Sequence, residues 1–147
     1  MNQVENPCGL HIGFVDFAVP TLLLLGEPSS FNWLADQIAK RQTIELKGAL
    51  SEGALSEQIA SLILLPVKQE GGLSRMGSTL EWRMIESEAN AIIQQLRGLA
   101  VSELPAHAYL DPINNMSRLQ VMASHGEYNY KLIFRDALQA NMARSKR

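Results

Sequence analysis

The part of the chain richest in reactive side chains is residues 107–112, which read His-Ala-Tyr-Leu-Asp-Pro. If residues 107–110 form a β-strand, His107 and Tyr109 lie on one face because side chains alternate, and Asp111 follows on that face at the strand's end. A histidine near a carboxylate can transfer a proton or hold part of a metal shell. A partly buried histidine bonded to a neighbouring carboxylate or carbonyl gives the same pattern without chemistry, and we favour this second interpretation.

The other residue types that support catalysis lack a useful spacing. A catalytic metal site usually needs three protein ligands, and His11 and His125 come without ligand-like spacing around them. The single cysteine, Cys8, excludes an internal disulfide and a multi-cysteine zinc site. The glycine-rich residues 71–77 lack the lysine of a phosphate loop, and the chain has no Gly-x-Ser-x-Gly motif. We therefore expect no catalytic residue, no metal and no cofactor.

Several acidic and aromatic side chains are candidates for binding a partner protein. Glu81, Glu86 and Glu88 cluster around the start of a predicted helix, where the helix dipole favours carboxylates in any case. Trp33 is the better surface candidate of the two tryptophans because polar residues flank it. We expect these residues on an exposed face that would bind a basic partner. The full set of candidate binding residues is Trp33, Glu81, Glu86, Glu88, His107, Tyr109 and Asp111.

Residues 22–41 predict a buried strand, a polar turn and an amphipathic helix. Either Ser29 or Ser30 is expected as the N-cap, because a serine hydroxyl can accept a bond from the first free helix amides. Residues 80–97 repeat the same plan, and Gly98 is available as a C-terminal cap for the second helix.

The remaining elements are predicted from alternation, from continuous apolar runs and from turn residues. The polar, glycine-containing residues 68–78 predict a loop and the best internal boundary. A turn is expected at residues 124–127, and Asp136 is expected to cap a terminal helix. The expected strands are residues 10–17, 21–25, 43–46, 59–67, 79–85, 106–110, 119–123 and 128–134.

The two strand–helix segments match at an offset of 58 residues, so that Leu22 falls on Leu80 and, farther on, Ile63 falls on Val121. Each half reads strand, helix, strand, strand. Because each half has one apolar helix face and one sheet face to cover, the halves can share a core. We predict an α+β fold: a mainly antiparallel sheet with two principal helices on one side. The single domain 1–147 would contain halves at about 10–68 and 78–134, and a C-terminal helix or tail at 135–147.

Composition narrows the classes of partner. The 147 residues are 46% apolar and 19% charged, with a net charge of −2, which are ordinary values for a globular domain. Such a charge gives no electrostatic basis for binding nucleic acid. The apolar runs at residues 19–25 and 62–67 are shorter than the roughly 20 residues that cross a membrane. The N-terminal residues lack the pattern of a secretory signal, and we expect a cytoplasmic protein.

Two sequence motifs resemble those of small bacterial immunity proteins of polymorphic toxin systems. In that family a Leu-x-Leu-x-Gly strand leads to a Leu-x-x-Leu-Ala helix, and a His-x-His-Leu-Asp strand follows. Here Tyr109 replaces the second histidine, and the two motifs lie in different halves. The resemblance implies a non-enzymatic protein that binds and blocks a cognate toxin. The matching positions are Leu23, Leu25, Gly26, Phe31, Leu34, Ala35, His107, Leu110 and Asp111.

Two other classes of function stay open from the sequence. One is a small-molecule-binding regulatory or dimerisation domain, a homodimer with its ligand between the two halves. The other is a metal-assisted or acid–base enzyme that uses His107 and Asp111.

Overall fold

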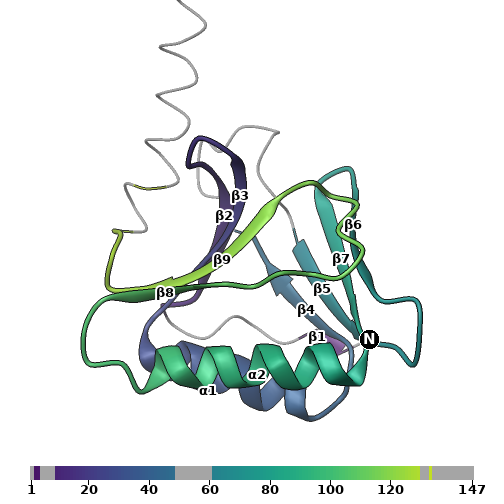
Figure 1. The fold of residues 1–147 in the computed structure, drawn as a ribbon, viewed down its shortest axis with the longest axis horizontal. Helices are drawn as coiled ribbons and strands as arrows, with labels where there is room; N and C mark the ends of the chain where they lie inside the picture. The colour runs from purple at the N-terminus through teal and green to yellow at the C-terminus, as the bar shows by residue number, and fades with distance from the viewer. Residues whose placement is uncertain (1, 4–8, 49–60, 130–132, 134–147) are drawn as a thin grey trace, which may run out of the picture.

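The computed structural model describes residues 2–3, 9–48, 61–129 and 133, and these contain two helices and nine strands (Figure 1). The predicted α+β class and its two principal helices are confirmed. The strands divide between two sheets, and antiparallel pairs outnumber parallel pairs.

The first sheet has the spatial order β2-β3-β9-β8, and the second has the order β1-β4-β5-β7-β6. The strands of the first sheet are β2 (His11–Asp16), β3 (Pro20–Leu25), β9 (Gln120–His125) and β8 (Ala106–Tyr109). Those of the second are β1 (Asn2–Gln3), β4 (Ile44–Lys47), β5 (Ser61–Pro66), β7 (Thr79–Met84) and β6 (Gly72–Met76). The helices are α1 (Pro28–Ala39) and α2 (Glu86–Ala100), which lie side by side beneath the two sheets (Figure 1).

Each sheet combines one antiparallel strand pair from each of the two pseudo-repeats. Each repeat has the order strand, strand, helix, strand, strand: β2-β3-α1-β4-β5 is followed by β6-β7-α2-β8-β9. The first sheet joins the first hairpin of one repeat to the last hairpin of the other, and the second sheet does the reverse. The joins are the parallel pairs β3/β9 and β5/β7, so neither sheet belongs to one repeat.

The strand registers define which residues of the two repeats are equivalent. Leu22 lies opposite Val121 in the first sheet, and Leu80 lies opposite Leu62 in the second. Leu62 is therefore the counterpart of Val121, and the sequence match of Ile63 with Val121 is wrong by one residue. Leu62 and Ile63 point to opposite faces of β5, because neighbouring side chains of a strand alternate between its faces.

One apolar core fills the space between the helices and the inner faces of both sheets. Phe31 and Trp82 are its largest fully buried side chains, and Leu96 on α2 is also completely buried. A smaller cluster covers the other face of the first sheet, around Leu23 and Met122. Burial on both faces explains the continuous apolar run of β3.

Both helices differ from prediction at one end. The N-cap of α1 is Glu27, with Pro28 at the first helical position, where a proline's fixed φ and missing N–H cost least. The Ser30 hydroxyl accepts the Glu27 N–H at 3.2 Å, so neither Ser29 nor Ser30 is the cap. Helix α2 continues through Gly98 to Ala100, and the predicted cap at Gly98 is wrong.

The predicted loop at residues 68–78 contains a strand that the sequence did not reveal. Residues 72–76 form β6 and pair with β7 through a two-residue turn in which Gly77 has φ +61°. Its single fully buried apolar side chain, Leu73, is too little to produce a periodic pattern.

The chain after β9 also departs from prediction. Strand β9 runs to His125, where a turn was expected. Tyr128 and Asn129 lie outside any strand, and Ile133 is helical, with its N–H donating to the Asn129 carbonyl at 2.8 Å. The predicted strand at 128–134 is therefore wrong at the described residues. Cys8, Asp136 and the predicted C-terminal helix or tail at 135–147 fall outside the described residues. Within the described part of the chain, neither helix is long and apolar enough to cross a membrane.

Candidate functional site

The edge strand β8 carries the residues that the sequence singled out first. His107 and Tyr109 are both exposed and share a face, as alternation predicted, and their ring centroids are 5.3 Å apart. Asp111 follows the strand and is also exposed.

The carboxylate that contacts His107 belongs to Glu127. His107 Nδ1 lies 3.0 Å and 3.1 Å from the two Glu127 oxygens, and the Ser124 hydroxyl donates to the same carboxylate at 2.6 Å. This contact arises because His107 lies opposite Ser124 in the β8/β9 pair, which brings Glu127 within reach. The predicted pairing with Asp111 is replaced by a partner 20 residues away in sequence.

The surroundings of Glu127 keep its carboxyl ionised at neutral pH. Burial is the largest single influence and raises the pKa of Glu127. Hydrogen bonds from Ser124 and His107, with the nearby charges of His107 and His125, oppose it, so the pKa of Glu127 lies below its ordinary value. The net result is a carboxylate suited to holding the His107 ring in place.

The arrangement does not make a hydrolytic triad. In a triad the serine hydroxyl bonds to the histidine, whereas the Ser124 hydroxyl donates to Glu127 and Ser124 is completely buried. His125 is buried on the same strand, and its Nε2 finds no hydrogen-bond partner. Among the described residues, no group of three or more His, Cys, Asp or Glu side chains could hold a metal ion.

The predicted acidic cluster does not form one exposed face. Glu88 is only 8% exposed; its carboxylate accepts the Trp82 Nε1–H at 3.2 Å and the Ile113 N–H at 2.8 Å. Glu81 is half-buried on β7, with Oε1 4.0 Å from Arg83 Nε, whereas Glu86 is exposed. Glu88 is corrected to a structural residue, because burying its carboxylate requires these two donors.

Trp33 is the more exposed of the two tryptophans, as predicted, since Trp82 is only 1% exposed. The Trp33 side chain is half-buried and packs against the main core, so only part of it is available to a partner. Amphipathic spacing places Trp33 at the border of the apolar face of α1, beside Leu34, and tertiary packing decides how much of it is covered.

Exposed apolar side chains gather along residues 101–116, where Tyr109 is the one apolar side chain that the sequence predicted as a binding residue. Eight large apolar residues of the described chain are exposed, and five of them lie within residues 101–116. Val101, Leu104 and Met116 are each more than 70% exposed. We call the five the β8 strip: Val101, Leu104, Tyr109, Ile113 and Met116.

The backbone of residues 101–116, which carries the β8 strip, crosses the molecule. It begins after α2, passes along β8 above that helix, and reaches the edge strand β6 (Figure 1). The amphipathic patterns of helices and strands do not extend into connections, which is why periodicity gave no signal here.

Hydrogen bonds fix the backbone of the β8 strip at three points. The Gln95 side-chain amide donates to the Tyr109 carbonyl at 2.9 Å. Farther on, Glu88 accepts the Ile113 N–H, and the Leu73 carbonyl accepts the Met116 N–H at 2.8 Å. Gly72 permits this last approach, since a Cβ there would lie 2.9 Å from the Asn114 carbonyl oxygen. The exposed side chains are thus held on an ordered support.

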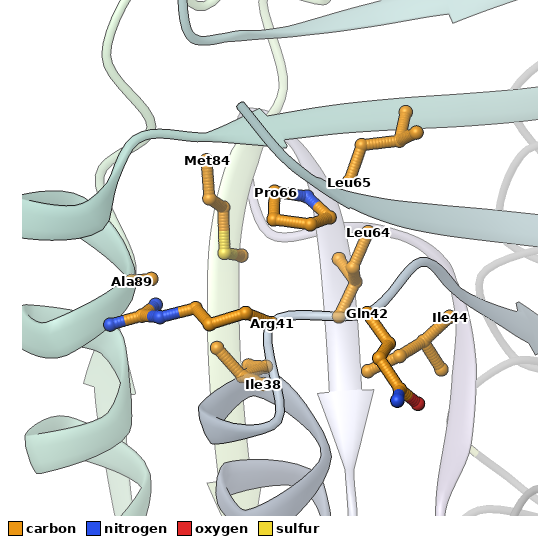
Figure 2. A pocket seen from close by; sticks show the side chains of 9 residues that line it. All are labelled: Ile38, Arg41, Gln42, Ile44, Leu64, Leu65, Pro66, Met84 and Ala89. Carbon is orange, nitrogen blue, oxygen red and sulfur yellow. The ribbon is translucent and has the colours of Figure 1, made fainter. Parts of the chain in front are cut away.

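The structure also has a hollow where the end of α1 meets α2 and the second sheet (Figure 2). Its empty volume is about 260 Å³, part of which is open solvent. Sites for small molecules usually enclose roughly 300–1,000 Å³, so this hollow is too small for a typical ligand. Figure 2 shows the Arg41 side chain extending toward Ala89 on α2, and Arg41 donates to Asn90 Oδ1 at 2.5 Å. The lining residues are Ile38, Arg41, Gln42, Ile44, Leu64, Leu65, Pro66, Met84 and Ala89.

No known protein-family model matches this chain, and no curated protein is similar to it.

Proposed function

We propose that this protein works by binding another protein and that it has no catalytic role. The observation that carries the proposal is the β8 strip: five exposed large apolar side chains within residues 101–116. A complex in which a partner removes exposed apolar side chains from water is stabilised by about 25 cal/mol per Å² of apolar surface buried. A surface with several of them is typical of a binding site.

The ordered backbone of the β8 strip strengthens this proposal. A partner that binds a preformed surface does not have to order it, so less of the interaction free energy is lost. The hydrogen bonds to Tyr109, Ile113 and Met116 provide such a preformed surface.

The more specific role that we propose is that of an immunity-type inhibitor, which would act in the cytoplasm of a bacterium by blocking a toxin. This step rests on the resemblance of residues 22–35 and 107–111 to immunity proteins. Co-expression with a toxin domain encoded beside this protein's gene tests it. Restored growth is expected, and continued killing despite good expression would contradict the inhibitor role.

The binding surface is tested by comparing two double variants. Leu104→Ser/Met116→Ser removes two residues of the β8 strip, and Val19→Ser/Met76→Ser removes two exposed apolar residues elsewhere. After capture from native cells and identification of the partner by mass spectrometry, affinity is measured with purified proteins. We expect the strip variant to bind at least about tenfold more weakly, a loss of about 1.4 kcal/mol, and the matched control to bind normally. Equal affinity of the two variants would contradict this assignment.

An acid–base enzyme is the second candidate, because Glu127 holds His107 by Nδ1 at 3.0 Å. A carboxylate that orients a histidine is one part of a general-base arrangement. Titration with zinc or manganese and the His107→Ala variant test this candidate. Unchanged metal response and unchanged biological activity in His107→Ala would eliminate it.

A further inference from the structure

We infer that the partner of the β8 strip presents apolar side chains together with lysines or arginines. This inference rests on the proposed protein-binding function and specifies the chemistry of the partner.

The segment of chain that carries the β8 strip contains acidic residues and no lysine or arginine. Residues 98–117 contain two carboxylates, Glu103 and Asp111, and no lysine or arginine. Both carboxylates are exposed, and neither forms an ion pair with any described residue. The single histidine of the segment, His107, contacts the Glu127 carboxylate at 3.0 Å.

The two carboxylates are spaced among the apolar residues. Glu103 lies next to Leu104, and Asp111 lies between Tyr109 and Ile113 in the sequence. A partner that covers the apolar side chains therefore has to approach both carboxylates and remove water from around them. Lysines or arginines at those places offset that cost, whereas carboxylates or phosphates there would repel.

Arginines lie at both ends of residues 98–117, and none of them pairs with Glu103 or Asp111. Arg97, one residue before the segment, donates to Asp36 at 2.7 Å and to Asn32 at 3.3 Å on α1. Arg118, after it, is exposed, and a nitrogen of the Arg83 guanidinium lies near Gly72, which approaches Asn114. Within residues 98–117 themselves, Glu103 and Asp111 have no ion-pair partner among the described residues.

The same charges disfavour other occupants of this surface. A nucleic acid or an anionic membrane would bring phosphates against Glu103 and Asp111. A second copy of this chain that docked strip to strip would bring four carboxylates together. A partner protein with an apolar and basic surface avoids both problems.

The test uses the full-length protein and two designed amphipathic helical peptides. Both peptides have identical leucine positions; the polar face carries lysines in one and glutamates in the other. Amide chemical shifts in heteronuclear NMR spectra report where each peptide binds and how tightly. We expect the lysine peptide to perturb amides of residues 101–116, to bind about tenfold or more tightly than the glutamate peptide, and to weaken as salt is added.

Charge-reversal variants identify the residues responsible. Glu103→Lys/Asp111→Lys should abolish the preference for the lysine peptide. The matched control Glu45→Lys/Glu70→Lys changes the net charge equally on the second sheet and the 67–71 connection, and should keep the preference. Equal binding of the two peptides by the native protein, binding away from residues 101–116, or loss of the preference in the control would overturn the inference. The weaker binding expected for Leu104→Ser/Met116→Ser does not depend on these outcomes, so the proposed function can stand if this inference fails.

Discussion

Glu88 joins three parts of the chain through its two carboxylate oxygens. It stands in the first turn of α2, it accepts the indole N–H of Trp82 on β7, and it accepts the backbone N–H of Ile113 in the β8 strip. A buried carboxylate is tolerated when both oxygens are bonded, and its position near the helix N-terminus adds a favourable dipole.

Replacing Glu88 by alanine should therefore destabilise the protein by about 2–4 kcal/mol. The indole N–H and the Ile113 amide would both lose their acceptor, and an unpaired buried donor costs about 1–3 kcal/mol. Urea denaturation measures the change. Glu86→Ala, in the same helical turn but exposed, is the control and should stay within about 0.5 kcal/mol of the native protein. Similar losses for the two variants would contradict the role assigned to Glu88.

The His107–Glu127 contact makes a pH-dependent contribution to stability. The pKa of Glu127 is lower in the folded protein than its ordinary value, so the folded state favours the ionised carboxyl. The resulting stabilisation is present above the pKa that Glu127 has in the unfolded chain, and it is lost as the pH falls through the lower pKa of the folded state.

Glu127→Gln should accordingly lower the urea midpoint at neutral pH, and this effect should shrink as the pH falls below the ordinary pKa of a glutamate. Denaturation of the native protein and the variant at neutral pH and over a series of acidic pH values checks this. Asp111→Asn, a nearby exposed carboxylate, provides the comparison. A variant effect that grew on acidification would have the wrong sign for this mechanism.

At the scale of elements, β3 and β7 occupy equivalent places and have different outer faces. Leu23 and Glu81 correspond at the 58-residue offset. Leu23 is completely buried in the smaller cluster with Leu25 and Met122, whereas Glu81 is half-buried beside Arg83. The first sheet thus buries apolar residues on both faces, whereas the outer face of β7 carries Glu81 and Arg83.

This difference predicts that alanine is tolerated at position 81 and not at the equivalent position 23. Leu23→Ala should destabilise by about 2–5 kcal/mol because it leaves a cavity in a buried cluster. Glu81→Ala should change stability by less than about 1 kcal/mol, since a weak surface ion pair is all that it loses. Thermal or urea unfolding of the two variants provides the measurement. Equal losses of stability in the two variants would contradict the difference in burial between Leu23 and Glu81.

The contacts between α1 and α2 also include equivalent residues of the two repeats. Asn32 and Asn90 are equivalent, and each accepts a hydrogen bond from an arginine of the other repeat, Arg97 and Arg41 respectively. These exposed contacts are individually weak, and the buried apolar faces of the helices supply most of the stability.

For the whole molecule, the exchange of hairpins implies that neither repeat can unfold alone. Each sheet loses half of its principal strands if either repeat detaches, and the main core contains residues of both. Unfolding should therefore be a single cooperative transition.

The two tryptophans allow a direct test, because Trp33 lies in the first repeat and Trp82 in the second. In the Trp33→Phe variant, fluorescence reports Trp82 alone and far-UV circular dichroism reports the whole chain. The two urea transitions are expected to coincide. Separate midpoints would show that the repeats unfold independently.

The sequence by itself determined the elements with strong local patterns. The 3.6-residue spacing of Phe31, Leu34 and Ile38 placed α1, and the apolar run at 22–25 correctly indicated a strand buried on both faces. The shared face of His107 and Tyr109 also followed from alternation alone. These features depend on neighbouring residues and on the geometry of one element.

The tertiary structure alone decided which strands pair and which polar groups meet. Similar apolar strands could pair in several ways, and the choice of β3/β9 and β5/β7 depends on how well the complete core packs. The burial of Glu88, the pairing of His107 with Glu127 and the exposure of the β8 strip all follow from that choice. Each joins residues far apart in the chain, because contact free energy depends on distance in space while a sequence pattern records only distance along the chain.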